Sequence, residues 1–153
     1  MKIEHHEELF PYLKGKVFHV TPSVNMQAIR DAGALFPNHH LNQPSRFGNT
    51  ENGFFRLRGC VSFFDYRGFG TREWKEHAYK CLPTMFLKRN NPITILFLCE
   101  SQFHKLESWK VWKEEAAWQQ RVVPHVETGY KGRVSLEFII EELGVESDNN
   151  YQV

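Results

Sequence analysis

The pattern of apolar and polar positions predicts three strands in the first two-thirds of the chain. Residues 16–20 alternate in the manner of a half-buried strand, and residues 59–64 form a second candidate that ends in the polar segment 65–67. Residues 93–99 are the most apolar stretch, so we expect a central strand there that is covered on both faces. This apolar stretch is far shorter than the ~20 residues of a membrane-spanning helix.

Apolar residues at helical spacing predict two helices between these strands. Thr21 is a candidate N-cap, Pro22 suits the first helical position and Gly33 suits a left-handed C-terminal residue, so we expect a helix over residues 22–32. Apolar residues spaced four apart over 74–82 predict the second helix. Residues 36–58 lack any sustained period and are rich in Asn, Gly, Pro, Ser and His, which is typical of a long loop and favours a mobile lid.

The last third of the chain is predicted to hold a strand and a terminal helix. Residues 121–127 read as a strand beside a proline, with a turn over 128–132, so Glu127 would lie at the exit of that strand. Apolar residues over 136–143 predict an amphipathic helix that Ser135 caps and Gly144 ends. Residues 108–113 fit both a helical face and a strand alternation, and both interpretations stay open.

These elements indicate a single α+β domain over residues 1–153, with flexible ends expected at 1–14 and 146–153. Hydrophobic residues make up 41% and charged residues 24%, the balance of a folded rather than a disordered chain. The N-terminus carries no signal-peptide pattern, so we expect a cytoplasmic protein that does not bind membranes.

Charge and metal-ligand residues give weak indications of function. The formal net charge of +1 provides no broad attraction for nucleic acid, although the arginines at 56, 58, 67 and 72 are a candidate phosphate-binding group. Three widely separated cysteines indicate neither a disulfide framework nor a zinc site. Adjacent histidines at 5–6 and 39–40 project in different directions, so we expect no metal.

Residues 17–35 resemble the opening of ADP-ribosyltransferase domains of the DNA-modifying toxin (DarT-like) type. The resemblance rests on a hydrophobic-His-hydrophobic-Thr strand followed by Asn, a hydrophobic pair and a helix-ending Gly-x-Leu. Residues 60–67 are similar to the second strand of this family, and Arg46 lies in a loop where the family also carries an arginine. Residues 126–127 and 132–140 look like the family's catalytic-glutamate strand and the short helix after it.

The resemblance implies an ADP-ribosyltransferase-like split central β-sheet with flanking short helices, and cleavage of NAD at its nicotinamide–ribose bond. Glu127 would stabilise the oxocarbenium-like transition state, and Arg46 would contact a phosphate or the acceptor. His19 would contact the adenosine ribose and Tyr66 the nicotinamide face. The residues assigned to NAD binding in this way are His19, Val20, Thr21, Asn25, Gly33, Leu35, Phe64 and Tyr66.

Several alternatives stay open at this point. Glu100 and Glu137 compete with Glu127 for the role of key acid, and His19 is either an NAD contact or a strand histidine that bonds to a backbone carbonyl. The acceptor could be DNA, RNA or protein; an RNA 2′-phosphotransferase and a catalytically silent NAD- or nucleotide-binding module share this fold. The enzyme hypothesis depends on one spatial condition: residues 18–21 and 126–128 must lie on neighbouring strands, as two walls of one slot. The oligomeric state is not indicated.

Overall fold

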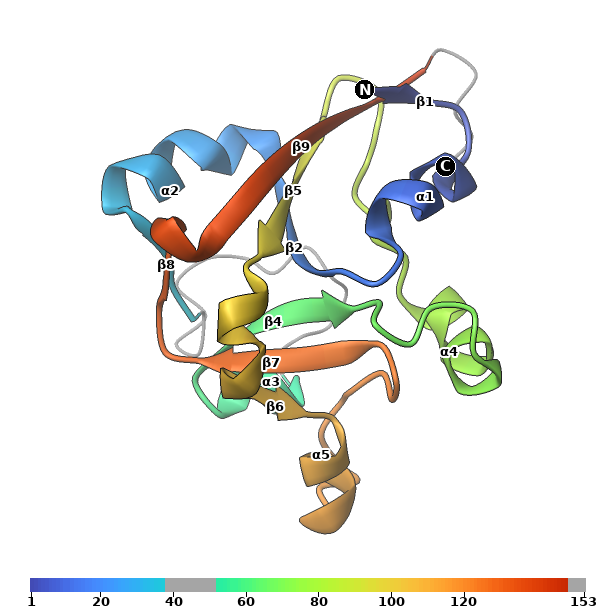
Figure 1. Cartoon of the computed structure of the whole chain (residues 1–153), viewed down its shortest axis with the longest axis vertical. Coiled ribbons are helices and arrows are strands. Elements are labelled where there is room, and N and C mark those ends of the chain that lie inside the picture. The colour runs from blue at the N-terminus through green and yellow to red at the C-terminus, as the bar shows by residue number, and fades with distance from the viewer. Residues whose placement is uncertain (38–51, 149–153) are drawn as a thin grey trace.

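The computed structural model describes residues 1–37 and 52–148, which form a mixed α+β arrangement around a mostly antiparallel sheet (Figure 1). The seven-stranded sheet has the order β1 (Lys2–Ile3), β9 (Ile139–Ser147), β5 (Ile93–Leu98), β2 (Val17–Pro22), β4 (Cys60–Asp65), β7 (Glu127–Lys131) and β6 (Leu106–Ser108). Strands β3 (Ala34–Leu35) and β8 (Val134–Ser135) form a second, two-stranded sheet. The pairing of β1 with β9 is parallel, and the other pairings are antiparallel.

Short helices connect and flank the strands. The α-helices are α1 (Phe10–Leu13), α2 (Met26–Ala32), α3 (Phe54–Leu57), α4 (Arg72–His77) and α5 (Lys110–Glu114). The 3₁₀ helices are η1 (His6–Leu9), η2 (Ser23–Asn25), η3 (Ala78–Lys80), η4 (Glu100–Lys105) and η5 (Leu136–Phe138). Within residues 1–37 and 52–148, no helix has the length and apolar character needed to cross a bilayer.

The sheet opens between β2 and β4. These strands pair at only two positions, Val17 with Asp65 and Phe18 with Phe64, whereas β2 pairs with β5 from Phe18 to its last residue. Beyond Phe18 the two strands therefore separate. Figure 1 shows the result: β5 and β9 run roughly crosswise to β4 and β7.

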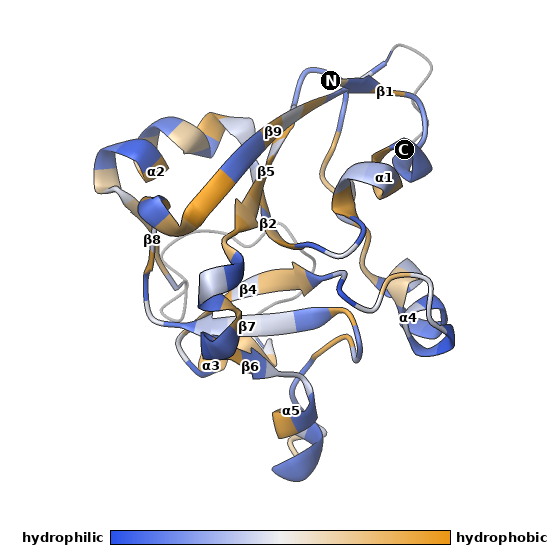
Figure 2. Ribbon diagram, in the orientation of Figure 1, coloured by the Kyte–Doolittle hydropathy of each residue, from blue (hydrophilic) through white to orange (hydrophobic). Residues whose placement is uncertain are grey.

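Buried side chains cover both faces of the sheet. Alternate residues of β5 belong to two different clusters, with Ile95 and Phe97 in one and Leu96 and Leu98 in the other. Because successive side chains of a strand point to opposite faces, these clusters lie on the two sides of the sheet. Figure 2 shows apolar residues along β5 and β4, whereas α2 and α4 carry many polar ones.

Three predicted strands are confirmed. All six residues of β5 are buried, as expected for a central strand, and β4 and β2 cover the other two predicted segments. Gly33 ends α2 with φ 71°, and its N–H bonds to the carbonyls of Ile29 and Arg30, as the left-handed terminus predicts.

The predicted start of the helix over residues 22–32 is wrong. Thr21 and Pro22 pair with β5 and continue β2, and a turn of 3₁₀ helix precedes α2. The Thr21 side chain accepts a hydrogen bond from Asn25 Nδ2 at 3.2 Å instead of capping the helix with its oxygen. Backbone pairing with a buried strand thus overrides the local N-cap signal.

Other helix predictions hold in part. The segment predicted from the spacing over 74–82 forms α4 and η3, which together end at Lys80. At 108–113 the helical interpretation holds from Lys110, while Ser108 still belongs to β6.

The predicted strand over 121–127 is wrong, because β7 begins at Glu127 and runs through the segment expected to turn. Pro124 has no N–H for a strand ladder, and His125 adopts a left-handed backbone with φ 63°, so the chain turns just before Glu127. Glu127 consequently lies at the entry of its strand and not at its exit.

The predicted terminal helix is also wrong. Ser135 caps η5 by accepting a bond from the Glu137 N–H, but the chain then extends as β9 along the free edge of β5. Gly144 lies inside this strand, opposite Thr94. An unpaired edge on a fully buried strand needs a hydrogen-bonding partner, and this requirement outweighs the helical spacing.

The expected flexible ends are ordered over most of their length. Ile3, Leu9 and Leu13 are buried in the core, and Glu146 and Ser147 pair with β1. Residues 149–153 lie outside the described residues. So do residues 38–51, which include Arg46, one of the histidine pairs and most of the predicted lid.

We predict that Gly129→Ala destabilises the fold by about 1–3 kcal/mol, because a Cβ at this position would overlap the Phe55 ring. Gly144→Ala is the matched control, since the same Cβ in β9 would meet open space. Denaturant unfolding of both variants measures the difference, and equal stabilities would contradict the close packing of α3 on β7.

Candidate active site

His19 lies on β2 just past the point where β2 and β4 separate. Its Nδ1 is 2.8 Å from the backbone oxygen of Ser62 on β4. A carbonyl oxygen only accepts, so Nδ1 carries the proton and Nε2 of the neutral ring is an acceptor. Burial lowers the pKa of His19 and outweighs the Ser62 carbonyl, which would raise it. The histidine therefore bonds to a carbonyl across the opening, as the plainer interpretation expects, with an acceptor nitrogen left for a ligand.

The residues after His19 form a small polar group at the end of β2. Val20 is buried in the core, and Thr21 is buried with its hydroxyl held by Asn25. The hydroxyls of Ser23 and Thr94 lie 2.8 Å apart and connect this group to β5. Thr21 and Asn25 are therefore positioned together, whereas the Val20 side chain serves the core.

Gly33 and Leu35 have clear structural roles. Gly33 ends α2, and its carbonyl accepts a bond from the Leu136 N–H at 3.0 Å. Leu35 is buried and pairs with Val134 in the small sheet. These contacts attach the end of α2 to the segment that follows β7.

Phe64 and Tyr66 lie within the core. The Phe64 ring stacks on Phe18 with centroids 5.2 Å apart, and the Tyr66 ring meets Trp74 edge to face at 5.2 Å. Tyr66 has 0% exposure, so in this structure its ring cannot meet a nicotinamide face as the resemblance implies. Burial also raises the pKa of Tyr66 above its ordinary value.

Glu127 is a half-buried carboxylate at the start of β7. Its Oε1 accepts a bond from the Val123 N–H at 2.9 Å, and its own N–H bonds to the Val123 carbonyl at 3.0 Å. Burial raises the pKa of Glu127 to about 7, against the lowering effect of the Val123 N–H. The carboxyl therefore exchanges its proton near neutral pH, as an acid or base at a reaction site often does.

The expectation that the His19 and Glu127 segments occupy neighbouring strands is wrong, because β4 lies between β2 and β7. The register nevertheless aligns them in one row, in which Phe64 pairs with Phe18 on one side and with Glu127 on the other. Adjacent strands are about 4.8 Å apart, so the backbones of Phe18 and Glu127 lie about 10 Å apart. Paired residues of neighbouring strands project to the same face, so the Glu127 side chain shares the face of Phe18 and Phe64, whereas His19, the next residue of β2, projects to the opposite face and contacts Phe63.

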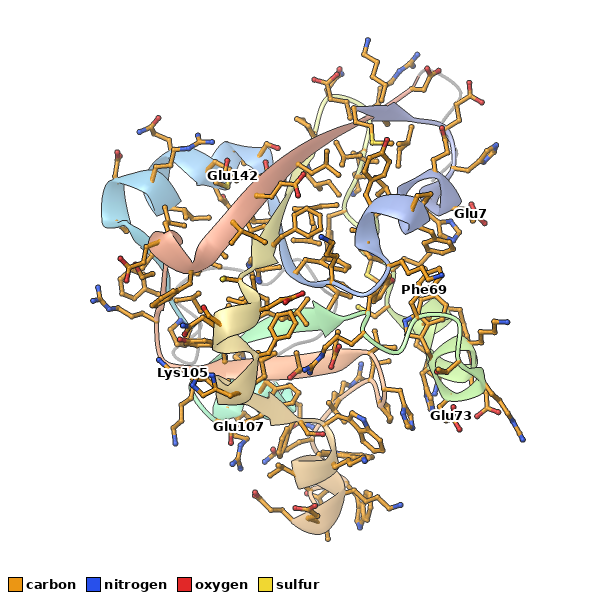
Figure 3. The ribbon with its side chains drawn as sticks, in the orientation of Figure 1. Glu7, Phe69, Glu73, Lys105, Glu107 and Glu142 are labelled. Atoms are coloured by element: carbon orange, nitrogen blue, oxygen red, sulfur yellow. The ribbon has the colours of Figure 1, made fainter. Side chains whose placement is uncertain are left out.

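The rival acids occupy exposed positions. Glu100 begins η4 and Glu137 lies in η5, and both side chains are exposed. Glu107 on β6, labelled in Figure 3, accepts bonds from Arg58 at 2.9 Å and from the Cys60 thiol at 3.1 Å. Of these carboxylates, only Glu127 combines burial with a place in the row that contains Phe18.

The arginines expected to favour phosphate are engaged elsewhere. Arg58 also bonds to Glu115, Arg67 bonds through two nitrogens to Asp65, and Arg72 bonds to Glu76. Each pair places a carboxylate against the guanidinium, so the predicted phosphate-binding group is not formed by these three side chains.

A row of rings beside Glu127 escaped the sequence analysis. His125 lies between Trp109 and His77, with centroid distances of 4.5 Å and 5.6 Å. His125 is close to Glu127 in sequence, which was the available signal. No periodic pattern could bring Trp109 and His77 to it from other segments.

The chain offers few metal ligands in the described part. Residues 1–37 and 52–148 contain no group of three or more His, Cys, Asp or Glu side chains that could hold a metal ion. Cys60, Cys81 and Cys99 are free thiols. Cys81 lies near the Glu127 carboxylate; burial and then that carboxylate raise its pKa to about 12, which makes the thiol a poor nucleophile.

No protein-family model matches the sequence, and comparisons with curated proteins and with solved structures found no match.

We predict that Glu127→Gln is more stable than the wild type at pH 8, and that this advantage is smaller at pH 5. The carboxyl binds its proton more tightly in the folded state, so the stability of the wild type falls as pH rises from about 4.5 to about 7. Over this pH range the free energy of unfolding of the wild type falls by about 3 kcal/mol, and the glutamine variant has no such loss because its amide does not titrate. Urea unfolding at several pH values measures the difference.

Glu100→Gln, at an exposed position, is the control for that experiment. A pH-dependent gain in this variant as large as that of Glu127→Gln would contradict the explanation from burial.

Proposed function

We propose that this chain is an NAD-dependent ADP-ribosyltransferase with an ADP-ribosyltransferase-like split sheet, acting on a macromolecular acceptor such as DNA, RNA or protein. The observations that support it best are the opening between β2 and β4, which the His19–Ser62 bond spans, and the half-buried Glu127 carboxyl on β7, whose pKa is raised to about 7. The intervening strand β4, and the opposite faces to which His19 and Glu127 project, count against a single slot between them. The resemblance in residues 17–35 and 126–140 assigns roles to these two side chains.

In the proposed reaction, His19 and Glu127 would each contact a ribose hydroxyl of NAD. With Nδ1 bonded to Ser62, the His19 Nε2 would accept a hydrogen bond from a ribose hydroxyl of NAD. Glu127, fixed through Oε1 by the Val123 N–H, would hold a hydroxyl of the nicotinamide ribose with its second oxygen. Each contact uses an atom that its own backbone partner leaves available.

The reaction requires Glu127 in its ionised form. As the bond between the ribose C1′ and the nicotinamide nitrogen breaks, its electron pair leaves with nicotinamide and positive charge develops on the sugar. The half-buried carboxylate stabilises that charge where water screens it little. An oxygen or nitrogen of the acceptor then bonds to C1′ and releases its proton to water.

Two features modify the assignment that the resemblance implies. Tyr66 is buried, so another surface would have to receive the nicotinamide ring. Ser62 has an exposed side chain in the middle of β4, where it pairs with Gly129 of β7. Free thiols at all three cysteines agree with a reducing compartment such as the cytoplasm.

The alternative functions differ in how well they fit. An RNA 2′-phosphotransferase needs free basic side chains for its phosphate, and the pairing of Arg58, Arg67 and Arg72 with carboxylates opposes it. A catalytically silent NAD- or nucleotide-binding module is favoured by one observation, the engagement of the Glu127 carboxylate by its own backbone turn.

We expect purified protein to release nicotinamide from labelled NAD, and Glu127→Gln to lower this release by about 100-fold or more, as for the loss of a main electrostatic stabiliser. The wild-type rate should rise between pH 6 and pH 8, because the pKa of Glu127 is raised to about 7. Glu100→Gln and Glu137→Gln, both at exposed positions, are matched controls.

Equal release by wild type and Glu127→Gln would remove Glu127 from the mechanism. Binding of NAD without any release by the wild type would favour the silent module.

A further inference from the structure

Three rings from separate segments meet beside the turn that leads into β7. Trp109 precedes α5, His125 lies in the turn, and His77 ends α4. The His77 and His125 planes are 24° apart, close to parallel, and the Trp109 and His125 planes are 50° apart. The His125 ring is thus held from two sides by segments remote in sequence.

The backbone of His125 is in a conformation that side chains disfavour. Its φ of 63° is left-handed, a region that residues other than glycine rarely adopt because the Cβ crowds the backbone. Strained residues of this kind persist only where surrounding contacts hold them. At His125 two kinds of contact do so: the ring meets Trp109 and His77, and the backbone on either side of it is hydrogen-bonded within the turn.

This turn also closes directly on the Glu127 carboxylate. The N–H groups of Val126 and Glu127 bond to the Val123 carbonyl at 3.3 Å and 3.0 Å. In return, the Val123 N–H bonds to Glu127 Oε1 at 2.9 Å. The carboxylate therefore keeps its place only while the chain from Val123 to Glu127 keeps this shape, and His125 lies at the centre of that segment.

We propose that His125 is a positioning residue: its ring, stacked between Trp109 and His77, keeps the turn over residues 123–127 closed and so holds the Glu127 carboxylate in place. Its importance for a reaction rests on the proposed ADP-ribosyltransferase function, whereas its effect on the carboxylate does not. In this proposal His125 acts through the turn and the Glu127 carboxylate, and not by contact with a substrate.

The stack is also sensitive to pH. Lys80 Nζ donates to His77 Nδ1 at 2.7 Å, which requires that nitrogen to be unprotonated. Burial, the Lys80 ammonium and His125 lower the pKa of His77, and only Glu76 opposes them. A protonated His77 would lose the bond to Lys80 and place a cation against the His125 ring. The Glu127 end of the turn faces the Cys81 thiol and the Val123 N–H. Acid conditions should therefore open the stack from the His77 side.

The first variant removes the His125 ring and keeps a residue type that accepts the left-handed backbone. Asparagine tolerates a left-handed backbone, so His125→Asn deletes the stack with little added strain. His125→Phe keeps a ring of similar shape, and His104→Asn replaces an exposed histidine of η4 as the matched control. Trp109→Leu breaks the stack from its other side without altering the turn itself.

Two NMR measurements on these variants report on the turn and need no substrate. In His125→Asn and Trp109→Leu, we expect the Val123 amide to exchange with solvent about tenfold faster. We also expect the Glu127 carboxyl, labelled with carbon-13, to titrate at a pH closer to 4.5, its ordinary value, because water reaches it. His125→Phe and His104→Asn should behave as the wild type does.

Wild-type exchange and wild-type titration in His125→Asn would overturn the proposal. If that variant does not fold, the same result in Trp109→Leu would overturn it.

Nicotinamide release separates this inference from the proposed function. We expect His125→Asn to lower kcat more than it changes KM and to move the pH profile toward acid, with recovery in His125→Phe. NMR effects without any wild-type release would leave the positioning role standing and refute the enzyme proposal. Release that depends on Glu127 but is unchanged in His125→Asn, with unchanged NMR, would refute the positioning role alone.

Discussion

The separation of β2 from β4 after Phe18 is the constraint on which the rest of the site depends. Past that position the two strands no longer share a hydrogen-bond ladder, and the His19 ring bonds to the Ser62 carbonyl at 2.8 Å across the opening. This one bond gives the Ser62 carbonyl a partner across the opening and selects the tautomer of His19 at the same time. The two halves of the sheet can then run crosswise, and the part of β4 beside the opening pairs with the residues of β7 that follow Glu127.

Much of the sheet could be predicted from the sequence where burial alone decides the structure. Every residue of β5 is apolar or small and every one is buried, and the left-handed Gly33 ends α2 as its type indicates. The C-terminal segment could not be predicted in this way. Its apolar residues repeat at helical spacing, but the free edge of β5 requires a strand, and that edge lies far away in sequence. The prediction that Thr21 caps a helix is wrong for the same reason, because the Thr21 backbone pairs with Thr94 of the distant strand β5.

The residues of the candidate site also differ in whether a local sequence pattern could predict them. His19, Thr21, Asn25 and Glu127 could be named from their order along the chain, because each belongs to a short local pattern. Tyr66 fitted its pattern equally well, yet it fills the core beside Phe18 and Trp74. Whether a strand residue faces a ligand or the interior depends on which helices cover it, and no local pattern contains that information. The stack of Trp109, His125 and His77 is the extreme case, because three unrelated segments build it.

The late position of β9 along the chain has a consequence for biosynthesis. During translation, β5 leaves the ribosome well before the segment 139–147 that completes its second edge. Until then the most apolar strand of the protein has an open ladder, which other nascent chains can join. Truncations or premature stops that remove β9 should therefore yield aggregates instead of a smaller stable domain, and chaperones would be needed most in this interval of synthesis.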